Sequence, residues 1–124
     1  MITIRLPWPP KELSPNARVH WAKKAKAAKQ YRELAWAQTL LNGDADAPID
    51  WIECYNLRLT FHPPDRRRRD LDNMLASIKA GIDGIADAIQ VDDQHFSLTL
   101  QRGEPTKGGE VVAVITEGAE HEKV

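Results

Sequence analysis

The sequence predicts an α+β fold, a small mixed β-sheet of about four strands with two helices, in the order β-α-β-α-β-β. Two observations lead to this prediction. Four short segments alternate apolar and polar residues, as strands with one buried face do. Two longer segments lack proline and have either a helix-forming composition or an apolar repeat of 3.6 residues. At 124 residues the chain is long enough for one such domain, residues 1–124, and too short for two.

The sequence of the first half of the chain predicts a strand followed by a long helix. Residues 2–6 alternate between apolar and polar, and Pro9 and Pro10 follow as breakers. Residues 17–41 are rich in alanine, lysine, leucine and glutamine, with no glycine or proline. Gly43 is expected to close this helix.

The second half predicts a strand, a helix and two more strands. Residues 51–61 alternate in the manner of a half-buried strand, which the His62-Pro63-Pro64 segment ends. A second helix is expected over residues 71–89. Alternation then resumes at 96–100 and at 111–116, on either side of a Lys-Gly-Gly turn. Residues 117–124 are expected to form a flexible tail.

The second predicted helix has three distinct faces at 100° per residue. One face is an apolar stripe expected to enter the core, and it consists of Leu71, Leu75, Ile78, Ile82, Ile85 and Ile89. Another face carries Asp72, Ala76, Lys79 and Asp83. The third face has small side chains that permit close approach, namely Ser77, Ala80, Gly81, Gly84 and Ala88. It could lie against the sheet or form a dimer contact.

Composition argues for a cytoplasmic protein without a membrane segment. The longest apolar runs are too short to cross a bilayer, and the first residues do not resemble a signal peptide. The single cysteine, Cys54, cannot form an internal disulfide and is expected to be a buried filler.

The net charge of −1 conceals a segregation of charge along the chain. Before Glu33 there are eight basic residues and one acidic residue, Glu12. From Asp70 to Asp93 there are six aspartates and one basic residue, Lys79. Such a chain can bind a polyanion with one surface and a cation with another. The lysines between residues 23 and 29 could equally be a solvated helix face.

The most informative segment is residues 65–73, which read D-R-R-R-R-D-L-D-N. Arginines bind phosphodiester oxygens through bidentate forks, and aspartates offer the hard oxygen ligands that Mg²⁺ requires. Asp70 and Asp72 are therefore candidate metal ligands. The alternative is that they stabilise a helix start, where acidic residues are common.

A second acidic pair, Asp92-Asp93, falls between the second helix and the third strand. We expect the chain to return this pair to the neighbourhood of Asp70 and Asp72. Three or four converging carboxylates would repel one another without a bound cation. The sequence therefore predicts a Mg²⁺ site and, with the arginine run, a metal-dependent nuclease.

Several motifs together resemble the RusA-type Holliday-junction resolvases, endonucleases common in prophages. The motifs are the run from Arg66 to Asn73, the Lys79-x-x-x-Asp83 spacing, the Asp92-Asp93 pair, the L-P-W-P-P segment at residues 6–10 and the K-G-G turn at 107–109. The resemblance covers nearly the whole chain. It implies a homodimer that depends on Mg²⁺, for which Mn²⁺ can substitute, and that cuts four-way DNA junctions by symmetrical paired nicks.

The resemblance also implies roles for individual residues. Asp70, Asp72 and Asp93 correspond to the metal ligands of the family, with Asp92 beside them. The essential lysine follows the D-x-D motif on the same helix. Some members place it where this chain has Ala76, so the role is assigned to Lys79 one turn later, although Lys79 could instead pair with Asp83. The expected DNA-binding residues are Asn16, Arg18, Arg66, Arg67, Arg68, Arg69 and Asn73.

Two other functions are compatible with the same residues. One is a junction-binding protein that has lost catalysis, against which the intact set of aspartates counts. The other is a metal-dependent phosphohydrolase of small phosphoesters. The amount of cationic surface exceeds what a mononucleotide needs and counts against it.

Overall fold

The computed structural model of the chain describes residues 2–42, 55–90 and 96–117. Its elements, in chain order, are β1 (Ile2–Pro7), the 3-10 turn η1 (Lys11–Leu13), α1 (Trp21–Asn42), β2 (Tyr55–His62), α2 (Leu71–Ile89), β3 (Phe96–Arg102) and β4 (Glu110–Glu117). This order confirms the predicted α+β arrangement. Residues 51–54 of the expected second strand, which include Cys54, lie outside the described residues, as do residues 118–124 of the expected tail.

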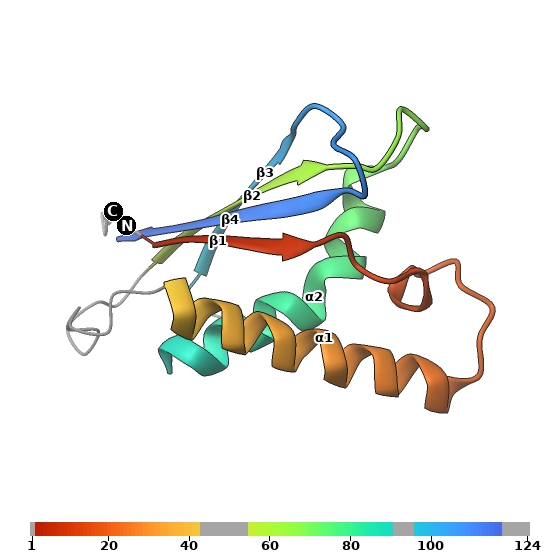
Figure 1. The fold of residues 1–124 in the computed structure, drawn as a ribbon, viewed down its shortest axis with the longest axis horizontal. Helices are drawn as coiled ribbons and strands as arrows, with labels where there is room; N and C mark the ends of the chain where they lie inside the picture. Colours follow the sequence, from red (N-terminus) through yellow and green to blue (C-terminus); the bar gives the residue numbers. More distant parts are fainter. Residues whose placement is uncertain (1, 43–54, 91–95, 118–124) are drawn as a thin grey trace.

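The four strands form one mixed sheet in the order β1-β4-β2-β3 (Figure 1). β4 is antiparallel to both of its neighbours, whereas β2 and β3 are parallel. A parallel pair requires a crossover connection, and α2 provides it between β2 and β3. Consequently β2 and β3 both point toward the end of the sheet where α2 begins.

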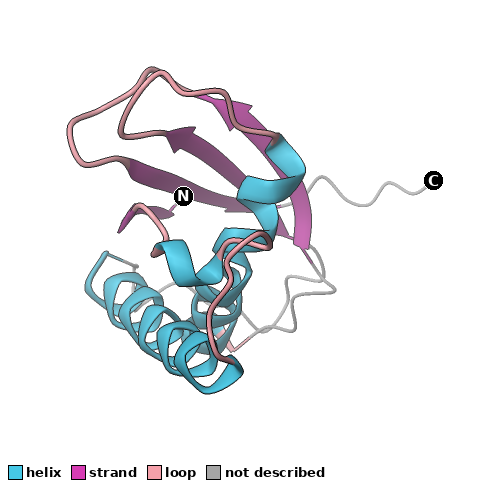
Figure 2. Ribbon diagram, turned by 90° about the vertical axis from the view of Figure 1, so that its right-hand side faces the viewer, coloured by secondary structure: helices cyan, strands magenta, loops and turns pink. Residues whose placement is uncertain are grey.

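Both helices cover the same face of the sheet (Figures 1 and 2). The alternation read from the sequence accounts for this arrangement, since every second strand residue points into the helix layer. The buried strand residues on that face are Ile4, Leu6, Tyr55, Leu57, Leu59, Phe61, Val111, Ala113 and Ile115. The opposite face carries polar or half-buried side chains such as Arg58 and Val114. Neither described helix is long and apolar enough to span a membrane.

The first helix starts four residues later than the sequence predicted. The backbone N–H groups of Lys23 and Lys24 donate to the His20 carbonyl, and the Ala22 N–H donates to His20 Nδ1 at 3.1 Å. His20 therefore takes the orphan amides of the first turn and fixes the start of α1 at Trp21. The composition of residues 17–20 did not reveal this capping contact.

The buried face of α2 agrees with the prediction except in the first turns of the helix. Its four isoleucines are buried, but Leu71 and Leu75 are half-buried and Met74 is buried in their place. The first turn of α2 thus rotates Met74 toward the core.

The small-residue face of α2 packs against α1, which neither sequence-based interpretation anticipated. A Cβ built on Gly84 would overlap the Arg32 carbonyl oxygen and lie 3.0 Å from the Ala35 Cβ. A Cβ on Gly81 would lie 2.8 Å from the Tyr31 ring. The glycines therefore allow the two helices to approach closely. Sequence periodicity identified the face but could not name its partner.

Tyr31 connects this helix pair to the sheet. Its hydroxyl donates to the Pro7 carbonyl at the end of β1 over 2.6 Å, and burial raises the pKa of Tyr31 above its usual range. The hydroxyl therefore stays protonated and remains a donor. α1, α2 and the end of β1 are held together at this point.

We predict that Gly84→Ala lowers the free energy of unfolding by about 1–3 kcal/mol, because the added methyl group must displace the α1 backbone. Chemical denaturation measures this change. Ala76→Ser, on the exposed side of α2, is the matched control and should change stability by less than about 0.5 kcal/mol. Equal stability of Gly84→Ala and the wild type would contradict the close helix contact.

Candidate functional site

The arginine-rich segment forms the loop between β2 and α2, at the end of the sheet where β1 and β2 finish. The Thr106 N–H, from the β3–β4 connection, donates to the Pro63 carbonyl at 2.9 Å. Gly109 of the same connection has φ +75° and lies so close to Trp8 and Pro64 that a Cβ would meet both at about 3 Å. The predicted Lys-Gly-Gly turn is thus confirmed. It packs against Pro63 and Pro64, which precede the arginine residues of the loop.

Arg69 differs from the other arginines of the loop because its side chain is already engaged. Its Nη1 donates to the Asp65 carboxylate at 2.8 Å, and its guanidinium lies 5.5 Å from the centre of the Trp8 ring. Its side chain is only 20% exposed. Arg69 therefore organises the loop, whereas its predicted role in DNA binding stays a prediction.

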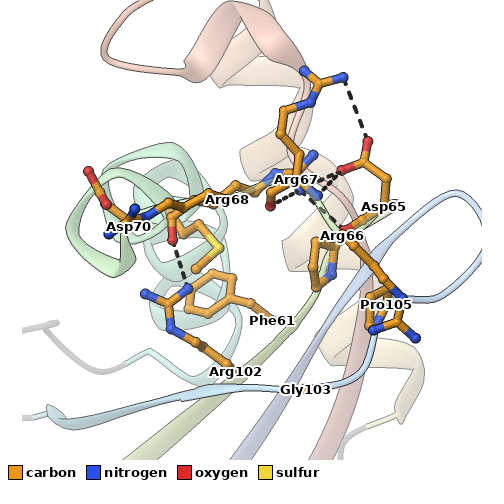
Figure 3. Close-up of a pocket in the computed structure, with 12 residues that line it drawn as sticks. Phe61, Asp65, Arg66, Arg67, Arg68, Asp70, Arg102, Gly103 and Pro105 are labelled. Atoms are coloured by element: carbon orange, nitrogen blue, oxygen red, sulfur yellow. Dashed lines mark hydrogen bonds and ion pairs between the residues drawn. The ribbon is translucent and has the colours of Figure 1, made fainter.

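The Asp65 carboxylate accepts hydrogen bonds from two other residues of the loop and so stabilises its conformation. It accepts hydrogen bonds from the Arg69 side chain and the Arg67 backbone N–H, and these hydrogen bonds lower the pKa of Asp65. On the other side, Arg102 Nη1 from the end of β3 donates to the Arg69 carbonyl at 2.7 Å (Figure 3). The peptide that precedes Asp70 is thus fixed from two directions.

The other three arginines leave their guanidinium groups accessible. Arg66, Arg67 and Arg68 are exposed, and Arg67 makes only a loose ion pair with Asp65 at 3.8 Å. Together with Asp70 and Arg102 they line a pocket of about 380 Å³ (Figure 3). This pocket is suited to an anion with several oxygens.

Asp70 and Asp72 stand at the start of α2 with their carboxylates exposed. Asp70 occupies the N-cap position, with φ −85° and ψ 141°, yet its side chain makes no capping hydrogen bond. Asp72 accepts only from its neighbour, since Oδ1 lies 3.0 Å from the Asn73 backbone N. Neither carboxylate forms an ion pair within the described part of the chain. Helix capping therefore does not explain this pair, and its oxygens fit the donor set that Mg²⁺ requires.

A second pocket of about 740 Å³ adjoins the first and brings in the loop that follows β1. Its lining brings Asn16, which follows β1, together with Asp70 and Asn73 of the 65–73 segment. Arg18 is exposed but lines neither pocket. Sequence reasoning missed Lys11 and Arg102, which join the site only because the fold brings distant loops together. Trp8 had appeared only as part of a motif.

Asp92 and Asp93 lie outside the described residues, although the chain on either side of them is described. Gln90 directly follows α2, whose 19 residues span roughly 28 Å from Asp70. Phe96 begins β3 beside the first residue of β2, whereas Asp70 follows the far end of β2. Both flanks therefore lie at the opposite end of α2 from Asp70 (Figure 1). This geometry does not favour the return toward Asp70 that the sequence analysis expected.

Lys79 lies on the same side of α2 as Asp72 but two turns away, roughly 10 Å along the axis. Its Nζ donates to Asp83 Oδ1 at 2.6 Å, and its side chain is 56% exposed. The ion pair that the sequence analysis named as the alternative is therefore present. Lys79 lines neither of the two pockets.

The described residues contain no group of three or more His, Cys, Asp or Glu side chains placed to hold a metal ion. Asp70 and Asp72 supply two carboxylates, which is fewer than the family resemblance implies. The other ligands that the resemblance implies, Asp92 and Asp93, lie outside the described residues.

Comparison with known proteins identifies the relatives of this chain. No model of a known protein family matches it. It is 34% identical to the crossover junction endodeoxyribonuclease RusA of Escherichia coli K12 over 93% of both chains. The chain belongs to the RusA family. The RusA of Enterobacteria phage 82 is 31% identical over 92% of both chains. An uncharacterised protein of Xylella fastidiosa is 44% identical over 94% of this chain and 76% of its own length.

Membership of the RusA family confirms the resemblance drawn from the motifs. The names of these relatives describe endonucleases that cut DNA and act at crossover junctions. Nuclease chemistry is thus the family-level activity. The exposed aspartates and arginines at one end of the sheet are the residues of this chain that suit such chemistry.

We predict that Asp65→Asn destabilises the protein at neutral pH and that the difference from the wild type disappears in acid. The Asp65 pKa is lowered in the folded state, so its contribution is complete above its ordinary value of about 3.9. The contribution is lost as the pH falls through the lowered pKa. Thermal unfolding of both proteins from pH 7 to pH 2 measures the difference.

A double-mutant cycle with Arg69→Met isolates the responsible pair. The coupling between positions 65 and 69 should follow the same pH dependence. A coupling that is absent at pH 7, or unchanged at pH 2, would contradict the role of the Asp65–Arg69 pair.

Proposed function

We propose that this chain is a Mg²⁺-dependent endodeoxyribonuclease that resolves four-way DNA junctions by paired symmetrical nicks. One observation carries the proposal: the exposed carboxylates of Asp70 and Asp72 have no cationic partner in the described chain, although Asp70 lines the same pocket as three accessible arginines. Carboxylates beside arginines would normally pair with them. Here Asp65 and Arg69 pair with each other, which leaves cation-binding oxygens and phosphate-binding cations side by side.

The residues of the site match the requirements of phosphodiester hydrolysis. A Mg²⁺ ion bound by Asp70 and Asp72 would supply a hydroxide near neutral pH and stabilise negative charge on the phosphate oxygens. Arg66, Arg67 and Arg68 would bind the phosphates of the cut strand and its neighbours, which positions the backbone without reading its sequence. Asn16 and Asn73 add neutral hydrogen-bonding groups along the second pocket.

The third metal ligand, we infer, comes from a second subunit. Position 93 is three residues from both Gln90 and Phe96, and three residues of chain reach at most about 11 Å. α2 alone separates Gln90 from Asp70 by more than twice that distance. On this geometry we propose that Asp93 does not share an ion with Asp70 of its own chain. In a symmetric homodimer, each subunit can contribute Asp70 and Asp72 to one site and Asp93 to the other.

Lys79 completes the proposed active site as a group that can exchange Asp83 for a phosphate. A lysine stem can turn its ammonium by several ångströms, and the ion pair with Asp83 is exposed and weak. Near-normal cleavage by Lys79→Ala would remove this lysine from the mechanism.

We predict that the chain cuts a synthetic four-way junction in the presence of Mg²⁺ and not in its absence, and that a linear duplex stays intact. Asp72→Asn should abolish cleavage and leave junction binding equal or tighter, because one metal ligand and one negative charge are lost. Gel analysis of both substrates, with and without Mg²⁺, measures these outcomes.

Asp83→Asn is the matched control for Asp72→Asn, since it removes a carboxylate from the same helix at a position roughly 16 Å farther along its axis. Its cleavage should be retained. Binding of the junction without cutting by the wild type would instead indicate an inactive junction-binding protein. Hydrolysis of small phosphoesters alone would indicate a phosphohydrolase.

If each metal site is shared between two subunits, mixing two inactive variants should restore some cleavage. Asp70→Asn and Asp93→Asn proteins should each be inactive alone. After subunit exchange, a mixed dimer has both defects in one site and an intact second site. An equal mixture should therefore recover about a quarter of the wild-type sites. The products should be single nicks rather than paired ones.

Sites built within one subunit predict no recovery, because each site of a mixed dimer would then carry one defect. A mixture of Asp70→Asn with Asp72→Asn is the control, since both residues belong to the same subunit in either arrangement. It should remain inactive. Activity in this control, or none in the first mixture, would overturn the shared site.

A further inference from the structure

The first two turns of α1 lie outside the packed body of the protein. Residues 21–26 are all exposed, six in succession. A helix that lies along a domain buries at least one side chain in each turn. The buried residues of α1 begin only at Tyr31. Figure 1 shows this end of α1 extending past α2, on the side of the molecule where the arginine loop lies.

This projecting segment carries a dense positive charge. Lys23, Lys24, Lys26 and Lys29 are all exposed, and residues 21–32 contain no acidic residue. None of these four lysines forms an ion pair with a described residue. Arg32, where the helix joins the body, is by contrast bound to Asp87 through two hydrogen bonds of 2.6 and 2.9 Å.

The position of these lysines opposes the stability of the helix. Lys23 and Lys24 stand near the amino-terminal end of α1, where the helix dipole favours negative groups, and the first turn contains no acidic residue. Like charges along the segment also repel one another. Folding alone does not account for this arrangement, whereas a polyanion bound to the segment would relieve both effects.

An exposed aromatic ring stands at the start of the segment. Trp21 is 75% exposed, and its ring lies 5.5 Å from the ring of His20. Residues 14 and 16 of the loop that leads to Trp21 line the second pocket of the candidate site. The segment between β1 and the projecting helix therefore borders the candidate site, and its two cations, Lys11 and Arg18, are exposed.

We propose that residues 21–29, the basic arm, bind the phosphate backbone of a duplex arm of the DNA substrate whose cut strand occupies the arginine-loop pocket. This inference rests on the proposed function. A duplex presents a continuous row of phosphates, and a helix with lysines on several sides can meet it without a unique rotation. The arm adds affinity for duplex DNA and does not read its sequence.

The test is the salt dependence of binding, measured by fluorescence anisotropy without Mg²⁺ on a labelled four-way junction. The variant is Lys23→Gln with Lys24→Gln and Lys26→Gln. Each phosphate contact contributes about 0.9 to the slope of log K against log salt concentration. The triple variant should therefore lose about 2 to 3 from the slope and bind at least about tenfold more weakly at 0.1 M salt.

Two controls separate specific contacts from net charge and from folding. Replacing the same three lysines by arginine keeps the charge and should preserve the wild-type slope. Arg58→Gln removes a cation from the opposite face of the sheet and should change the slope by less than a single arm lysine does. If the triple variant fails to fold, Lys24→Gln alone should reduce the slope by about 0.9.

The outcomes distinguish this proposal from the one on which it rests. A wild-type protein that binds the junction, with a triple variant of unchanged slope, overturns the basic arm and leaves the proposed function intact. A loss of slope in the arginine-substituted protein also overturns it. A wild-type protein that binds no DNA overturns both proposals.

Discussion

The ion pair between Asp65 and Arg69 is the interaction on which the candidate site depends. It closes the loop between β2 and α2, and the Trp8 ring and the Arg102 side chain hold the same arginine from two further sides. The Arg69 side chain thus pairs with Asp65 rather than with Asp70. One arginine of the run therefore serves the fold, so that three others remain free for an anion and two aspartates remain free for a cation.

The helix pair determines where this loop can lie. Gly81 and Gly84 let α2 approach α1, and Tyr31 ties both helices to the end of β1. These contacts fix the direction of α2, so its first turn meets the loop that follows β1. The same direction carries the far end of α2 away from the site. That separation is the physical reason why we propose two subunits for one metal site.

Much of this arrangement could be predicted from the sequence because it depends on local patterns. The strand alternation, the 3.6-residue repeat of α2 and the breakers at Pro63 and Pro64 each reflect a short stretch of chain, and the structure agrees with them. The position of Asp70 at the start of α2 followed from the same reasoning.

The rest depended on contacts between distant segments, which no periodicity encodes. Because His20 caps α1, the helix begins at Trp21 rather than at residue 17. The face of α2 with small side chains packs against α1. The division of the arginine run depended on Trp8 and Arg102, which lie far from it in the sequence. The expected return of Asp93 toward Asp70 relied on chain order alone, whereas the 19 residues of α2 place the flanking Gln90 at the far end of that helix from Asp70.

The most direct test of the central claim is anomalous diffraction from crystals of the protein soaked in Mn²⁺. The proposed shared metal site predicts an anomalous peak at the carboxylates of Asp70 and Asp72, with Asp93 of a second subunit as a further ligand. A peak whose ligands include Asp93 of the same chain would contradict the shared site. A peak elsewhere, or none at these aspartates, would contradict the proposed metal centre itself.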